Sequence, residues 1–125
     1  RLKALNVRPN LIVSSPAKRA ITTARLIAEA LGYDRDEIVE DDVLYSAFPK
    51  DTLKIIRTTP DSAESVMIFG HNPTMTDLVN RLSDFSVDNV ATCGAFCARF
   101  DVEEWAEVAE GEGEFVFFEY PKLVG

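Results

Sequence analysis

Two residues of this chain, Arg19 and His71, have side chains that could bind one phosphoryl group together. Arg19 comes shortly after the apolar run 11–13, and His71 comes shortly after the apolar run 66–69; it is the single histidine of the chain. If both runs are parallel strands of one sheet, the residues that follow them project at the same edge, where open α/β folds bind ligands. Helix N-termini at this edge favour anions. The spacing therefore predicts a phosphate site that contains Arg19 and His71.

Each of these residues also has an ordinary structural interpretation. Arg19 in the first turn of a helix adds a bidentate donor to the free backbone N–H groups, although most arginines simply lie on the surface. His71 could donate to a phosphoryl oxygen or move a proton, or it could be a loop histidine bonded to the backbone. We expect Gly70 to let the chain turn sharply and a ligand approach.

No other nucleophile or phosphate loop is indicated by the motifs. Ser14 and Ser15 are expected to be a strand end and a helix cap, because no G-x-S-x-G pattern surrounds them. Neither G-x-x-x-x-G-K-[ST] nor G-x-G-x-x-G occurs, so nucleotide-binding loops are not supported.

The composition excludes several classes of function. The 125 residues carry a net charge of -8 with a pI of about 4.6, which argues against binding to nucleic acid. No apolar run approaches the ~20 residues that span a bilayer, so no membrane contact is expected. Cys93 and Cys97 are expected to be small buried apolar groups in a reducing, cytoplasmic compartment. A single histidine leaves too few ligands for a metal site, and no cofactor is expected.

The pattern of apolar residues predicts one α/β domain over residues 1–125. Helices are expected over 16–31, 49–58 and 73–82, with Ser15 as the first N-cap, Pro16 at the first helical position and Gly32 as the C-cap. Strands are expected over 11–13, 65–69, 95–101 and 115–118, and 38–44 is a weaker strand or a loop. The alternation favours a three-layer α/β/α sandwich with a mostly parallel sheet. The last two strands lack a helix between them and are expected to pair as an antiparallel edge.

The beginning of the chain predicts a missing element. Residues 1–5 have the pattern of the last turns of an amphipathic helix that has no cap before it. We therefore expect the domain to be N-terminally incomplete, with its first β-α unit outside this chain.

Three segments resemble motifs of the histidine phosphatase superfamily. Residues 14–24, SSPAKRAITTA, are similar to its S-P-x-x-R-A-x-x-T-A segment, and residues 70–73, GHNP, resemble its second-histidine motif. Residues 44–47, LYSA, look like the L-Y-x-A of the small phosphohistidine phosphatase (SixA) branch. The resemblance extends along nearly the whole chain, to residues 91–94 and Trp105.

The resemblance implies a phosphatase that transfers a phosphoryl group to a histidine and then to water. It assigns Arg19 to holding the phosphoryl oxygens, and His71 to sharing that task and stabilising charge as the group moves. The family's nucleophilic histidine lies in an N-terminal R-H-G/A motif, which this sequence does not contain. His71 matches the second family histidine, so the nucleophile would lie in a missing unit of ~30 residues or more. The chain alone is expected to be inactive.

The resemblance also bears on the substrate. Many relatives carry a carboxylic acid near the third strand, but residues 43–47 contain none, and Glu40, Asp41 and Asp42 are expected to face solvent. An alkoxide leaving group needs a proton donor, whereas imidazole can leave already protonated. This difference favours a phosphohistidine on a protein as the substrate. Two alternatives stay open: a phosphate-binding or interaction domain without turnover, and a phosphatase of small phosphate esters.

Overall fold

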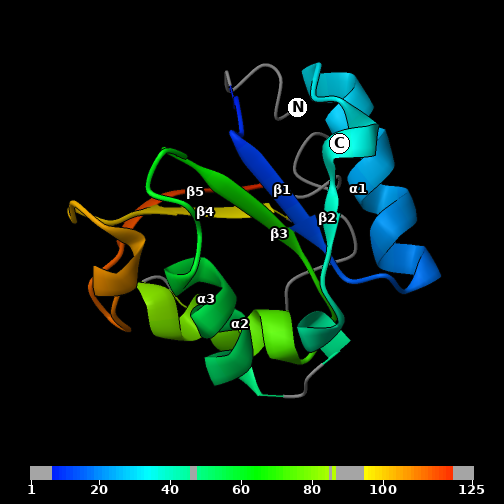
Figure 1. Ribbon diagram of the computed structural model, residues 1–125. Helices are drawn as coiled ribbons and strands as arrows, with labels where there is room; N and C mark the ends of the chain where they lie inside the picture. Colours follow the sequence, from blue (N-terminus) through cyan, green and yellow to red (C-terminus); the bar gives the residue numbers. More distant parts are fainter. Residues whose placement is uncertain (1–6, 46–47, 85, 87–94, 120–125) are drawn as a thin grey trace.

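A three-stranded parallel sheet forms the middle layer of the structure, a computed structural model that describes residues 7–45, 48–84, 86 and 95–119 (Figure 1). Its strand order is β2-β1-β3, and the strands are β1 (Leu11–Ser14), β2 (Val39–Glu40) and β3 (Val66–Phe69). A second sheet pairs β4 (Ala95–Arg99) with β5 (Glu114–Glu119) in the antiparallel sense. The helices are α1 (Lys18–Leu31), α2 (Pro49–Arg57) and α3 (Thr74–Leu82), and three short 3-10 helices are η1 (Arg35–Glu37), η2 (Asp42–Tyr45) and η3 (Trp105–Glu107).

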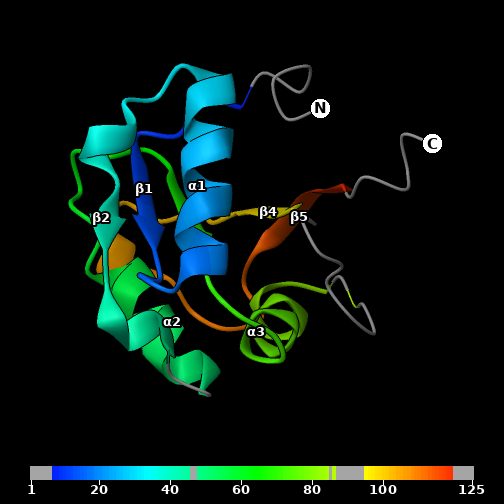
Figure 2. The same ribbon diagram turned by 90° about the vertical axis from the view of Figure 1, so that its right-hand side faces the viewer.

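Helix α1 covers one face of the parallel sheet, while α2 and α3 lie on the other side (Figures 1 and 2). Successive side chains of each strand point alternately toward these two layers, because side chains on a pleated strand alternate between its two faces. Ile12, Met67 and Phe69 pack with Ala24 and Ala28 of α1, and Ile12 and both alanines are completely buried. The small alanines allow α1 to approach the sheet closely. This arrangement confirms the predicted three-layer α/β/α class.

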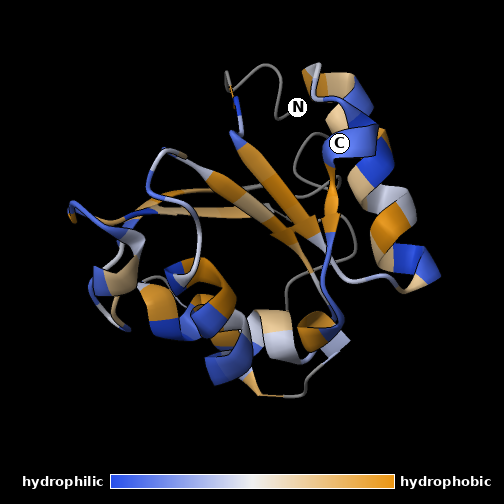
Figure 3. Ribbon diagram, viewed as in Figure 1, coloured by the Kyte–Doolittle hydropathy of each residue, from blue (hydrophilic) through white to orange (hydrophobic). Residues whose placement is uncertain are grey.

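The opposite face of the same strands packs under η2 and α2. Val13 of β1 and Ile68 of β3 lie in a cluster with Leu44 of η2 and Ile55 of α2. Because both faces of the sheet are covered, β1 and β3 are apolar along most of their length (Figure 3). Leu44 is 1% exposed, so η2 is fixed against the sheet immediately before Tyr45.

Asn10 fixes the register of β1 and β3 at their amino ends. Its side-chain Oδ1 accepts hydrogen bonds from the N–H groups of Glu64 (2.8 Å) and Ser65 (3.0 Å). The two strands then pair in parallel from Leu11 opposite Val66 to Ser14 opposite Phe69. Their carboxyl ends therefore stop at the same level.

The predicted limits of the first helix are correct at its end and wrong at its start. Gly32 has φ 77, and its N–H donates to the carbonyls of Ala28 and Glu29, which confirms the expected C-cap. The helix begins at Lys18 with Ala17 as the N-cap, instead of beginning at Pro16 after Ser15. The reason is that the Ser15 hydroxyl accepts the N–H of Ala17 at 3.2 Å, which closes a turn before the first helical residue.

The antiparallel pair of β4 and β5 shares a core with the second helical layer. Phe96 and Phe100 pack against a buried cluster from α2, α3 and the segment after η3: Leu53, Ile56, Leu78, Leu82 and Val108. Ile68 of β3 packs against the same cluster. The predicted antiparallel pairing is confirmed, and in the described part of the chain it forms a sheet of its own.

Several expectations concern residues outside the described ranges. Cys93, the helix end over residues 1–5, and residues 91–94 all fall outside the description.

Cys97 is half-buried and its thiol is free. Burial raises the pKa of this thiol, so it is protonated at neutral pH. None of the described helices has the length and apolar character needed to cross a membrane.

Two buried threonines differ in whether their hydroxyl group is hydrogen-bonded. They therefore allow a matched test of how a buried hydroxyl affects stability. Thr52 in α2 is completely buried, and its Oγ1 has no hydrogen-bond partner within the described structure. Thr76 in α3 is 7% exposed, and its hydroxyl donates to Asn72 Oδ1 at 2.8 Å. We predict that Thr52→Val raises the free energy of unfolding by about 1 kcal/mol, because it removes an unsatisfied polar group. Thr76→Val should lower it by about 1 kcal/mol. Urea unfolding measures both, and changes of the same sign in the two variants would contradict this description of the core.

Candidate phosphate-binding site

The loops after β1 and β3 meet at the carboxyl edge of the parallel sheet. The N–H of Ser15, one residue past β1, donates to the carbonyl of Phe69 at 2.9 Å. This bond continues the pairing of Ser14 with Phe69 for one more step. The loop that leads into α1 and the loop that carries His71 are therefore held side by side, as the sequence predicts.

His71 contacts the first loop through its side chain. Its Nε2 lies 2.8 Å from the Oγ of Ser15, a residue 56 positions earlier in the chain. Ser15 is completely buried, and its Oγ also accepts the N–H of Ala17. A hydroxyl can donate one hydrogen bond and accept two, so Ser15 can bond to Nε2 in either tautomer of His71 while it accepts the Ala17 N–H. Ser15 thus fixes both the start of α1 and the orientation of the imidazole.

Tyr45 also constrains the orientation of the His71 imidazole, by stacking on one face of the ring. The two rings stack with centroids 5.9 Å apart and planes 6° apart. Tyr45 ends η2, and its neighbour Leu44 anchors that segment in the core. The imidazole is therefore constrained at one nitrogen by Ser15 and on one face by Tyr45. Ser46 and Ala47, which complete the L-Y-x-A resemblance, are outside the described residues.

The segment after His71 enters α3 with satisfied caps. Asn72 Oδ1 accepts the N–H of Thr76 at 3.2 Å, and the His71 carbonyl accepts the N–H of Met75 at 2.9 Å. The Asn72 side chain therefore binds the first turn of α3, and the helix begins at Thr74 with Pro73 as the N-cap, one residue later than expected.

The packing around Gly70 gives a structural reason for a glycine at this position that the sequence did not indicate. A Cβ at Gly70 would lie 2.7 Å from Cε and 3.2 Å from Sδ of Met75, so the missing side chain makes room for Met75. Because the crowding atom is the flexible end of a methionine, this is a modest constraint. Gly70 is also absent from the glycines with positive φ, which are Gly32 and Gly111 in the described chain.

Arg19 lies at the second position of α1, in its first turn, and its side chain is exposed. No hydrogen bond or ion pair of its guanidinium to another described residue is present; its backbone carbonyl accepts the Thr23 hydroxyl at 2.9 Å. The structure thus brings the loop and helix end that carry Arg19 next to His71, without a direct contact between the two side chains.

The contact between Ser15 and His71 also raises the possibility of a serine nucleophile. Such a nucleophile needs a hydroxyl next to a base and open to the substrate. Ser15 has no exposed surface. The hydroxyl therefore acts as a structural partner of His71, in agreement with the absence of a G-x-S-x-G motif.

Carboxylates near the site lie at the end of β2. Asp41 donates its N–H to the Ser14 carbonyl at 3.0 Å, which places it at the same sheet edge. Its Oδ1 accepts the N–H of Val43 at 2.9 Å, so this carboxylate caps η2 and is only half-exposed. Glu40 and Asp42 are exposed, as expected. The described residues contain no cluster of metal-ligating side chains.

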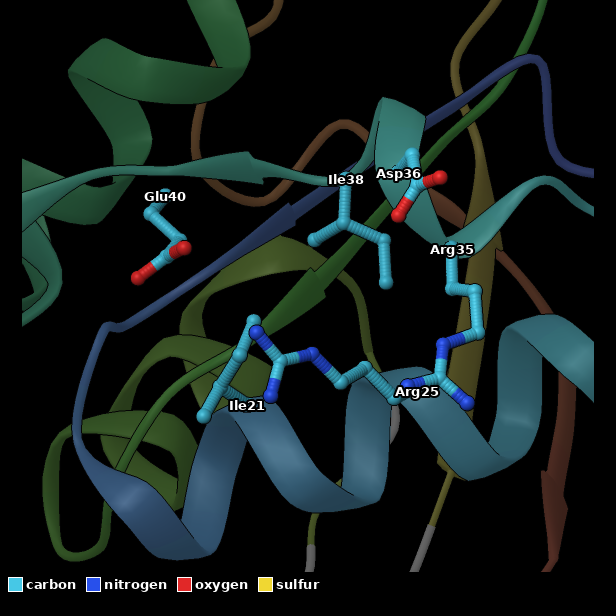
Figure 4. Close-up of a pocket in the computed structure, with 6 residues that line it drawn as sticks. All are labelled: Ile21, Arg25, Arg35, Asp36, Ile38 and Glu40. Atoms are coloured by element: carbon cyan, nitrogen blue, oxygen red, sulfur yellow. The ribbon is translucent and has the colours of Figure 1, made fainter.

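A hollow of about 360 Å³ lies between α1 and the segment that runs from η1 into β2 (Figure 4). Its polar lining consists of Arg25, Arg35, Asp36 and Glu40, and neither Arg19 nor His71 lines it. Two cations are matched by two carboxylates, and Arg35 also lies 3.8 Å from Glu29. This balance of charge makes the hollow a poor phosphate site in comparison with the edge beside His71.

Sequence reasoning identified the two loops but missed Ser15 and Tyr45 as partners of His71. Ser15 was interpreted only as a cap, and nothing in local spacing indicates that its hydroxyl reaches a residue 56 positions away. For Tyr45 the sequence offers one signal, its place in the L-Y-x-A resemblance. That resemblance does not indicate that the ring stacks on His71.

Comparison with known proteins supports the fold. No protein-family model matches the chain, and no curated protein sequence matches it. A solved structure from Nakamurella multipartitia, which carries the provisional name phosphohistidine phosphatase SixA, superposes with a TM-score of 0.77. The two chains are 19% identical, and the match covers 96% of this chain and 75% of the other. At this identity the likeness establishes the shared α/β fold.

The Ser15 contact can be tested directly because His71 is the single histidine of the chain. We predict that Ser15→Ala changes the ¹⁵N chemical shift of His71 Nε2 and weakens the nuclear Overhauser contacts between the His71 and Tyr45 rings. The substitution removes the hydroxyl that orients the imidazole. Ser62→Ala, in an exposed turn, is the control and should leave both signals unchanged. Unchanged imidazole signals in Ser15→Ala would contradict the assigned role of Ser15.

Proposed function

We propose that this chain is the phosphate-binding part of a histidine phosphatase related to SixA, with a phosphohistidine on a protein as its substrate. The observation that carries the proposal is the contact of 2.8 Å between His71 Nε2 and Ser15 Oγ. It holds the imidazole against the loop that opens the helix of Arg19. A phosphoryl group at this edge would meet the Arg19 guanidinium, the free N–H groups of the first turn of α1 and the His71 ring.

These groups are suited to stabilising a phosphoryl group while it is being transferred. The helix terminus and guanidinium favour negative charge on the three peripheral oxygens. His71, fixed by Ser15 and Tyr45, could donate to one of these oxygens as charge develops in the transition state. Because its partners hold the ring before substrate arrives, little reorganisation would be needed during the reaction.

The proposed nucleophile is a histidine outside residues 1–125. The chain contains one histidine, and His71 is engaged with Ser15 at the phosphate-binding edge. In the described part of the chain, β3 pairs only with β1 and β4 pairs only with β5, while Ile68 of β3 and Phe96 of β4 share one core cluster. A further strand that runs parallel to β3, between β3 and β4, would present the residue at its carboxyl end at the sheet edge that carries His71. The proposal is compatible with the coverage of the Nakamurella match, which takes in 96% of this chain and 75% of the other, so that the other chain has residues without a counterpart here.

A second candidate function is phosphate binding without turnover. The observation in its favour is the same single histidine, since a chain that binds a phosphoryl group needs no nucleophile. Hydrolysis of small phosphate esters, the third possibility, would call for a proton donor to the leaving alkoxide. The half-exposed Asp41 follows β2 at this sheet edge, and its bond to the Val43 N–H engages its carboxylate in the turn.

Anion binding by the 125-residue chain tests the site without requiring catalysis. We predict that titration with tungstate, a tetrahedral oxyanion, shifts the imidazole signals of His71. Arg19→Ala should weaken binding roughly ten- to hundredfold, because a charge-assisted hydrogen bond contributes about 1.5–3 kcal/mol. Arg25→Ala, which removes another exposed cation of the same helix, is the matched control and should bind like the parent chain. Equal losses in the two variants would remove Arg19 from the site.

Activity measurements test the need for a further strand. We predict that the 125-residue chain releases no phosphate from a phosphohistidine peptide, and that a longer protein with the proposed nucleophile strand does. In that longer protein, Arg19→Ala or His71→Ala should lower kcat by at least about a hundredfold while the circular-dichroism spectrum stays unchanged. Phosphate release by the 125-residue chain would contradict the location of the nucleophile, and normal kcat in either variant would exclude that residue.

A further inference from the structure

Exposed apolar side chains gather on the segment that follows β2. Val43 is 45% exposed, Tyr45 57% and Phe48 61%, and Val39 on the edge strand is 47% exposed. Val43 and Tyr45 also line one hollow, and exposed apolar side chains that lie together mark a place of interaction. This group adjoins the proposed site, because one of its members is the Tyr45 that stacks on His71.

The segment borders a hollow of about 690 Å³ between η2 and α2. Val43, Tyr45 and Ile55 supply apolar lining. Since Tyr45 lines the hollow and its ring stacks on His71, the hollow lies beside the proposed phosphate-binding edge. A chain that presents a phosphorylated side chain to His71 would have its neighbouring residues at this hollow.

The charged lining of the hollow is predominantly acidic. Asp41, Asp42 and Asp51 contribute carboxylates, and Lys54 is the cation among the residues that line it. The phosphate-binding edge has the opposite character, since it presents Arg19 and a helix N-terminus. A substrate that is anionic at one point and cationic a few residues away would match both.

The aromatic residue in the lining suits a cation as well. Tyr45 lines the hollow together with the carboxylates of Asp41 and Asp42. Aromatic rings bordered by carboxylates bind lysine and arginine side chains through both cation–π and Coulomb attraction. Small sugar phosphates have no group that would use such a surface.

We infer that the hollow between η2 and α2 binds a lysine- or arginine-bearing segment of the substrate protein, beside its phosphohistidine. This inference rests on the proposed function, whose substrate it narrows to phosphohistidines with basic flanking residues. Val43 and Tyr45 would contact the aliphatic stems of these residues, while Asp42 and its neighbours meet the charged ends. Specificity for the protein would then come from a surface separate from the groups that hold the phosphoryl oxygens.

Four short labelled peptides test the inference by fluorescence anisotropy with the 125-residue chain. Each contains one histidine, either free or replaced by a phosphonate analogue of phosphohistidine, and is flanked by either lysines or glutamates. We expect the basic analogue peptide to bind at least about tenfold more tightly than the acidic one at low salt, with the difference shrinking as salt screens the charges.

A matched pair of variants locates the effect. Asp42→Asn in the first turn of η2 should weaken binding of the basic peptides at least about threefold. Asp36→Asn makes the same charge change in the first turn of η1, at the other hollow, and should bind like the parent chain. Equal binding of basic and acidic peptides, or equal effects of the two variants, would overturn the inference.

The outcomes for this inference and for the proposed function are distinct. Preference for lysines that depends on Asp42, with no gain from the phosphonate, would support the docking surface and contradict the phosphatase. A gain from the phosphonate with no preference for lysines would do the reverse. Sedimentation that shows a dimer disrupted by Asp42→Asn would assign the hollow to a second copy of this chain, and would also overturn the inference.

Discussion

The parallel pairing of β1 with β3 is the constraint on which the site depends. Asn10 fixes the register at the amino ends, and the Ser15 N–H extends it to Phe69 at the carboxyl ends. Because the strands stop at the same level, their two loops are neighbours although 56 residues separate Ser15 from His71. A shift of one residue would turn Ile12 away from α1 and move Ser15 out of reach of His71.

The two helical layers make this register the favourable one. Small alanines of α1 pack on Ile12 on one face, and Leu44 with Ile55 packs on Val13 on the other. These buried groups place both ends of the site on rigid elements: Arg19 on the first turn of α1 and Tyr45 on the anchored η2. The imidazole is therefore oriented by packing and by one hydrogen bond, which is what a preorganised charge-stabilising group requires.

Local patterns in the sequence predicted the elements well, because each element satisfies its own apolar periodicity. The Gly32 cap and the apolar strand β3 both agree with the structure. The start of α1 was wrong by two residues because the Ser15 hydroxyl closes a turn before the helix begins. The paired β4 and β5 were expected as a sheet edge, and in the described chain they form a separate sheet.

The site itself was predictable in its loops and unpredictable in its contacts. A glycine, histidine and capping residues after an apolar run mark a strand-to-helix junction, but they do not say which distant side chain touches the histidine. Ser15 and Tyr45 became visible as partners of His71 only through the tertiary packing. The space at Gly70 likewise belongs to Met75, whose position no local rule supplies.

The central claim is that a guanidinium and an imidazole from two adjoining junctions hold one tetrahedral anion. A crystal structure of the chain grown with vanadate tests it most directly, since the heavy anion is located without ambiguity. The account predicts one vanadate at the start of α1, with oxygens within hydrogen-bonding distance of both the Arg19 guanidinium and the His71 ring. Vanadate bound to only one of these side chains, or bound elsewhere with this edge empty, would contradict it.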